Sequence, residues 1–175
     1  GATGAGKSTL VKLLLRINEV TAGTISYSGT DIRSLSQQTI RQVISYVPQK
    51  AFLFSGTILS NLLMGNAKAT TEEIRTALEI SQSSEFIDSL PQGIESFVAQ
   101  GGSNYSGGQK QRMCIARALI KPADVYIFDD SFSALDYKTD AALRAALHAQ
   151  MSDKTLLIVA QRLSTIMNAD NIIVL

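Results

Sequence analysis

Residues 104–113 read Asn104-Tyr-Ser-Gly-Gly-Gln-Lys-Gln-Arg-Met113, and this stretch decides the fold of the 175-residue chain more than any other. Ser106 can cap a helix that begins at the glycines, because a serine oxygen accepts a hydrogen bond from a backbone N–H of the first turn. The glycines leave those N–H groups open to an anion. Alone, the pattern also fits an ordinary glycine-rich helix start, so its meaning depends on the motifs around it.

Upstream, Gly1-Ala-Thr-Gly-Ala-Gly-Lys-Ser-Thr9 fits the pattern G-x-x-x-x-G-K-[ST] of a phosphate-binding loop. We expect the backbone N–H groups of residues 4–8 to surround a β-phosphate, Lys7 to reach the β- and γ-phosphates, and the Ser8 hydroxyl to ligate Mg²⁺. The predicted nucleotide contacts are Gly1, Gly4, Ala5, Gly6, Lys7, Ser8 and Thr9. Kinases, GTPases, motors and transporters share this loop, so it predicts a ligand and not an activity.

Downstream, Val125-Tyr-Ile-Phe-Asp129 is an apolar strand that ends in a carboxylate. Strand ends on one side of a parallel sheet converge on the phosphate site, so Asp129 can hold the water shell of Mg²⁺. Gln49 follows an earlier strand, and we expect it to bridge the metal or the attacking water to the segment beyond it. Taken alone, a glutamine in a turn is usually only solvated.

Together these motifs resemble the ATP-binding cassette (ABC) family of ATPases over essentially all 175 residues. The resemblance makes Gln49 the Q-loop glutamine, residues 106–109 the signature, and Ser133-Ala-Leu-Asp136 the D-loop between the two sites; Tyr105 replaces the usual leucine. It implies a head-to-tail dimer that sandwiches two ATPs, in which each signature contacts the γ-phosphate held by the other subunit. The contacts implied for this purpose are Ser106, Gly107, Gly108, Gln109 and Asp136.

The succession of strand-like and helix-like segments predicts an α/β fold, a P-loop NTPase core with a parallel sheet. An antiparallel side-sheet and an inserted helical subdomain complete it. We expect one domain, cut at both ends, with the core at about 1–50 and 121–175 and the helical subdomain at about 51–120. The predicted helices are 9–17, 57–64, 71–81, 84–90, 137–151 and 163–168. The predicted strands are 23–29, 43–47, 125–128, 155–160 and 172–175.

Composition excludes several classes of protein. The chain has 45% hydrophobic and 18% charged residues, which is typical of a globular protein. Its 16 basic and 15 acidic residues nearly cancel, which argues against a nucleic-acid partner. No run reaches the roughly 18 apolar residues of a membrane span. The single cysteine, Cys114, suits a reducing compartment and is expected to pack as a small apolar residue.

Two positions depart from the active pattern of the family. Asp130 stands where the family has its catalytic glutamate, and Gln161 stands where it has the switch histidine. The aspartate is one methylene shorter, and glutamine has no cationic form with which to relay a proton. We therefore expect Asp130 to be a weakened base and Gln161 to sense the γ-phosphate. The predicted catalytic residues are Asp130, Gln161 and Gln49, and the predicted metal residues are Ser8, Gln49 and Asp129.

The stretches Phe52-Leu-Phe-Ser-Gly-Thr-Ile58 and Leu90-Pro-Gln-Gly-Ile94 resemble ABC exporters, in which these segments meet the coupling helices of the membrane domain. The resemblance implies an ATP-hydrolysing domain that uses ATP and Mg²⁺ to power outward transport, at the cytoplasmic face of the cell membrane. It also implies a second ABC subunit as partner, and the changes at Asp130 and Gln161 resemble the half of a heterodimer whose own site is degenerate. Two alternatives remain open: an ATP-gated dimerisation module without significant hydrolysis of its own, and a homodimeric exporter with slowed turnover. A soluble ABC protein acting on ribosomes or DNA is disfavoured.

Overall fold

A three-stranded parallel sheet forms the centre of the protein in the computed structural model, which describes residues 4–175. Its order is β3 (Ile44–Val47), β6 (Val125–Asp129) and β7 (Thr155–Val159), with Tyr46 opposite Ile127 and Asp129 opposite Val159. β6 is therefore paired on both sides. The predicted α/β class with a parallel core is confirmed.

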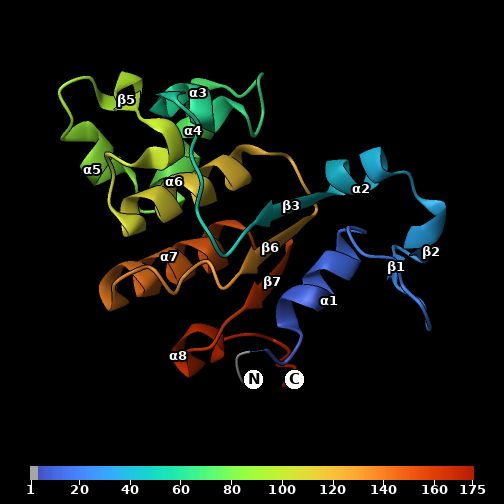
Figure 1. Cartoon of the computed structure of the whole chain (residues 1–175). Coiled ribbons are helices and arrows are strands. Elements are labelled where there is room, and N and C mark those ends of the chain that lie inside the picture. The colour runs from blue at the N-terminus through green and yellow to red at the C-terminus, as the bar shows by residue number, and fades with distance from the viewer. Residues whose placement is uncertain (1–3) are drawn as a thin grey trace.

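Helices cover both faces of this sheet (Figure 1), as an all-parallel sheet requires. α1 (Lys7–Leu14) and α2 (Gln37–Val43) lie on one face, where Val11 and Ile40 pack with Ile127 in a small core. α6 (Gly107–Ile120) and α7 (Tyr137–Gln150) lie on the other, where a larger core contains Phe128. Since successive side chains of a strand point to opposite faces, Asp129 lies on the same face as Ile127, toward α1.

The stretch from residue 52 to 120, which ends with α6, is mostly helical, as predicted. Before α6 it contains α3 (Ile58–Leu63), α4 (Thr71–Ile80), α5 (Ser84–Asp88) and 3-10 turns at Gly93–Glu95 and Gln100–Gly102. The sequence did not reveal one feature, the antiparallel pair of β4 (Gly56–Thr57) and β5 (Phe97–Val98). Strands of two residues are too short to show an alternating pattern.

The start of α4 is held by a capping box. The Thr70 hydroxyl accepts a hydrogen bond from the backbone N–H of Glu73, whose carboxylate accepts one from the backbone N–H of Thr70. Thr70→Ala removes the side-chain acceptor, and the expected cost is about 1 kcal/mol in the free energy of unfolding. Chemical denaturation measures it, and Thr71→Ala, one residue further on, is the control. Equal losses in the two variants would contradict the assignment of the cap.

The side-sheet is a hairpin of β1 (Ser26–Tyr27) and β2 (Thr30–Asp31), followed by a 3-10 turn at Ile32–Ser34. Its two turn residues, Ser28 and Gly29, have φ angles of 47° and 81°. Positive φ at both central positions marks the type I′ turn, whose twist matches that of an antiparallel pair. The antiparallel side-sheet is therefore present, but it is a hairpin where a single strand over 23–29 was expected.

Three predicted elements are wrong in extent or type. The helix expected over 9–17 begins at Lys7 and ends at Leu14, because Arg16 turns to a φ of 50° and the Ile17 N–H bonds back to the Lys12 carbonyl. The strand expected over 172–175 is not one: these residues are exposed and pair with no described strand. An apolar run becomes a strand only where a neighbouring edge supplies hydrogen bonds. α8 (Leu163–Ile166) is a single turn, shorter than expected. Within residues 4–175, no helix is long and apolar enough to cross a membrane.

Candidate nucleotide-binding site

The loop before α1 leaves the N-terminus of that helix open. Gly4 and Gly6 have φ angles of 86° and 92°, in the left-handed region that favours glycine, and no atom lies within 4 Å of where a Cβ would be. Gly6 is the N-cap, and no side chain caps the helix. The first backbone N–H groups of α1 therefore lack a side-chain acceptor, an arrangement that suits an anion. Ala5, Lys7, Ser8 and Thr9 belong to this turn, and Gly1 lies outside the described residues.

Asp129 holds α1 and β3 at the end of the central strand. The Ser8 hydroxyl donates to its Oδ1 at 3.0 Å, and the Tyr46 hydroxyl donates to its Oδ2 at 3.2 Å. The carboxylate is only 3% exposed, so these two donors compensate for much of the water that it has lost. Burial and the nearby Asp129 charge raise the pKa of Tyr46 to about 12, so its hydroxyl stays protonated and can donate.

Asp130 accepts hydrogen bonds from both glutamines that were predicted for catalysis. The Gln49 and Gln161 side-chain amides both donate to its Oδ2, at 3.1 Å and 3.2 Å. The backbone N–H of Asp130 donates to the Val159 carbonyl at 2.9 Å, so the strand pairing continues into this residue. Three residues from the ends of β3, β6 and β7 thus meet at one oxygen atom.

The surroundings of the Asp130 carboxyl group raise its pKa above the usual value. Burial and the adjacent Asp129 charge raise its pKa, while the hydrogen bonds from Gln49 and Gln161 act in the opposite direction. Its φ of 49° is also unusual for a residue with a side chain. A carboxylate with a raised pKa is a better base than an ordinary one, but here both amides already occupy one of its oxygens.

The start of α6 is exposed and presents the glycines expected of a signature. Ser106 caps the helix by accepting from the Gln109 N–H, and the Gln109 side chain accepts from the Ser106 N–H. The capping role expected of Ser106 is confirmed. Gly107 is exposed and has open space where a Cβ would lie, whereas Gly108 approaches the Ala134 carbonyl. Backbone N–H groups at this end can face an anion from outside the subunit.

Asp136 caps α7 by accepting from the Thr139 N–H at 2.9 Å. The Thr139 hydroxyl and N–H hold the pKa of Asp136 below its usual value, so this residue is ionised at neutral pH. Arg162 fixes the loop that precedes Asp136, because it donates to the carbonyls of Ser133 at 3.0 Å and Leu135 at 3.2 Å. The same region lines a cavity of about 220 Å³ beside Asp130 and Gln161.

Sequence reasoning missed Tyr46 and Arg162. Tyr46 sits in an apolar strand, and only the pairing of β3 with β6 brings its hydroxyl to Asp129. Arg162 follows Gln161 directly, so its place beside a motif residue was the one signal that could have singled it out.

The family model described as ABC transporter matches residues 1–133. The chain belongs to the ABC transporter family.

Named relatives and a solved structure agree with this assignment. The chain is 43% identical over 176 residues to the ATP-dependent lipid A-core flippase of Methylococcus capsulatus, matching all of this chain and 29% of that protein. It is 41% identical over 175 residues to heavy metal tolerance factor 1 of Caenorhabditis elegans, again over its whole length and 22% of the relative. It superimposes on a bacterial Atm1-family ABC exporter with ATP bound with a TM-score of 0.93 at 38% identity, covering 97% of this chain and 30% of that one. The chain therefore spans less than a third of these relatives.

The two ABC phosphate-binding elements do not meet within this chain. The N-terminal ends of α1 and α6 lie well apart, at the lower centre and at the left of the view (Figure 1). The structure brings Ser8, Gln49, Asp129, Asp130 and Gln161 together around the sheet ends, and it leaves the signature residues apart from them.

The oxygens at the sheet ends fit Mg²⁺. Mg²⁺ prefers oxygen ligands and is usually held by one or two carboxylates together with nucleotide phosphates. Ser8 Oγ and Asp129 Oδ1 supply a hydroxyl and a carboxylate oxygen 3.0 Å apart, directly beside the open end of α1. Among residues 4–175, no group of three or more histidine, cysteine or acidic side chains forms a metal site by itself.

Proposed function

We propose that this chain is the ATP-binding domain of an ABC exporter and that its own catalytic site is degenerate. The observation that supports this most strongly is the meeting of Gln49, Asp130 and Gln161 at one carboxylate oxygen. An active base must place an oxygen within hydrogen-bond reach of the attacking water, and the shorter side chain of Asp130 reaches less far than the glutamate it replaces. The Oδ2 atom of Asp130 is also held by two amides, neither of which can carry a proton away.

Within this proposal the remaining residues have separate roles. Lys7 and the open end of α1 hold the phosphates, Ser8 and Asp129 hold Mg²⁺, and Gln49 and Gln161 orient Asp130 and sense the γ-phosphate. When bound, Mg²⁺ neutralises charge on the phosphates. Residues 106–109 complete the site of a second ABC subunit, which fits their exposure and their distance from α1.

The membrane domain is the other proposed partner. Phe52, Phe54 and Met64 are 42%, 45% and 57% exposed, which is unusual for large apolar side chains that lie near each other. A domain placed at the cytoplasmic face of a membrane can cover them with coupling helices. The named relatives are a lipid A-core flippase and a heavy metal tolerance factor, and their names point to different compounds. We therefore assign the choice of transported compound to the membrane domain.

Phosphate release by the full-length protein tests the proposal. Purified alone, at concentrations that allow homodimers, the wild type is expected to bind ATP but to release phosphate slowly, because each site then pairs the signature of residues 106–109 with Asp130 and Gln161. Lys7→Ala is the matched control, since it removes the phosphate contact and is expected to abolish the binding as well. Brisk turnover by the wild type alone would overturn the degenerate site and favour a self-sufficient homodimer. ATP binding without any hydrolysis, even beside a competent partner subunit, would favour the dimerisation module.

A further inference from the structure

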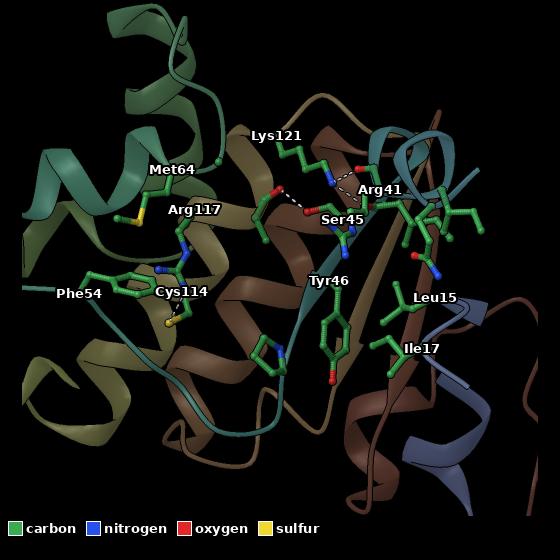
Figure 2. A pocket seen from close by; sticks show the side chains of 16 residues that line it. Leu15, Ile17, Arg41, Ser45, Tyr46, Phe54, Met64, Cys114, Arg117 and Lys121 are labelled. Atoms are coloured by element: carbon green, nitrogen blue, oxygen red, sulfur yellow. Dashed lines mark hydrogen bonds between the residues drawn. The ribbon is translucent and has the colours of Figure 1, made fainter. Parts of the chain in front are cut away.

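Tyr46 belongs to two sites at once. Its ring lines a groove of about 410 Å³ between β3, the end of α1 and α6, where it lies close to Leu15 and Ile17 (Figure 2). Its hydroxyl, at the far end of the ring, donates to Oδ2 of Asp129 at 3.2 Å. No other tyrosine among residues 4–175 has a hydrogen bond to Asp129. The contact depends on the register of the sheet, because Tyr46 pairs with Ile127 and Asp129 follows on the same face.

The hydroxyl of Tyr46 fixes the orientation of the carboxylate. A carboxylate can turn about its bond to the side chain, so that either oxygen can face a given direction. Here one oxygen is held by Tyr46 and the other faces Ser8, so the two donors between them leave a single arrangement. Loss of the Tyr46 hydroxyl would release Oδ2 and leave a buried charge with one side-chain donor fewer.

We propose that Tyr46 is a positioning residue for the metal of this site: its hydroxyl holds Oδ2 of Asp129 so that Oδ1 stays directed at the Ser8 hydroxyl. The proposal rests on the proposed ATP-binding function. Hydrogen bonds to metal-ligating carboxylates commonly set how well the ligand binds, and their removal costs on the order of 10-fold to 100-fold in metal affinity. Because the ring also lines the groove, the metal carboxylate and the groove share one side chain.

The test uses the full-length protein and a trinitrophenyl derivative of ATP as the fluorescent probe. Its dissociation constant is measured in EDTA and in excess Mg²⁺, and the constant in EDTA divided by the constant in Mg²⁺ reports how strongly the protein holds the metal with the nucleotide. Tyr46→Phe keeps the ring, and with it the wall of the groove. The variant is expected to leave the dissociation constant in EDTA unchanged and to lower the ratio on the order of 10-fold.

Tyr126→Phe is the matched control. Tyr126 lies on the neighbouring strand, and its buried hydroxyl donates to the Lys121 carbonyl at 2.7 Å, away from Asp129. The ratio of Tyr126→Phe is expected to equal that of the wild type. An unchanged ratio in Tyr46→Phe would overturn the proposal, and so would an equal loss of affinity in Mg²⁺ and in EDTA, which would show general support of the pocket. Failure of the wild type to bind the probe at all would instead overturn the proposed function.

Discussion

The double substitution Asp130→Glu, Gln161→His is expected to raise phosphate release by the homodimer on the order of 10²-fold, because a displacement of about an ångström at the reacting atoms costs a factor of that size. The added methylene carries the carboxylate further than the present position of Asp130 Oδ2, the atom to which Gln49 and Gln161 both donate. Histidine at 161 removes one of those amides and introduces a side chain that can take up and release a proton near neutral pH. Phosphate release in excess Mg²⁺ and ATP measures the gain.

The control for this experiment keeps the histidine and removes the base. Asp130→Asn, Gln161→His has the same switch residue but no carboxylate at 130, so its phosphate release is expected to stay at the level of the wild type. A gain of the same size in this control would assign the defect to Gln161 alone. No gain in the glutamate variant, with ATP binding intact, would mean that these two positions do not limit turnover.

Phe128→Ala is expected to cost about 3–5 kcal/mol in the free energy of unfolding, the usual range when a buried aromatic side chain is removed. Phe128 is 0% exposed on the central strand, pairs with Val47 and Ile158, and its ring centroid lies 5.3 Å from that of Phe132. The free energy of unfolding of a domain is commonly about 5–15 kcal/mol, so this one change removes a large share of it. Urea denaturation followed by circular dichroism measures the loss.

Phe54→Ala is the matched control for that substitution. Phe54 is 45% exposed, so its removal leaves little cavity, and surface changes usually stay within about 0.5 kcal/mol. If the two variants lost similar amounts, the core on the α6 and α7 side of the sheet would not be the main source of stability.

The sequence predicts those parts of the site that depend on local patterns. The open N-terminal end of α1, the cap at Ser106 and the carboxylate at the end of β6 follow from residue types at fixed spacing. The long helix α7 lies almost where a helix over 137–151 was predicted. Each of these depends on a few neighbouring residues, so one chain is enough to see it.

The remaining features depend on contacts between segments far apart in the chain. The Tyr46–Asp129 bond spans 83 positions, and the meeting of Gln49 with Asp130 spans 81. The alternation of side chains tells which face of a strand Tyr46 occupies, but only the register with β6 tells what it reaches. The strand predicted over 172–175 was wrong for a related reason. Its apolar composition is visible in the sequence, but the neighbouring strand that it would need is not.

The double pairing of β6 also bears on how this site can move. Opening the central strand breaks the hydrogen-bond ladders to β3 and β7 together, so it belongs to the last part of the fold to come apart. Asp129 lies at the end of that strand and Asp130 continues its pairing, whereas Gln49 and Gln161 lie in exposed turns just beyond the two outer strands. Local fluctuations can therefore carry the two amides away from a carboxylate that itself stays in place. Local opening of the site is a movement of its glutamines and not of its acids.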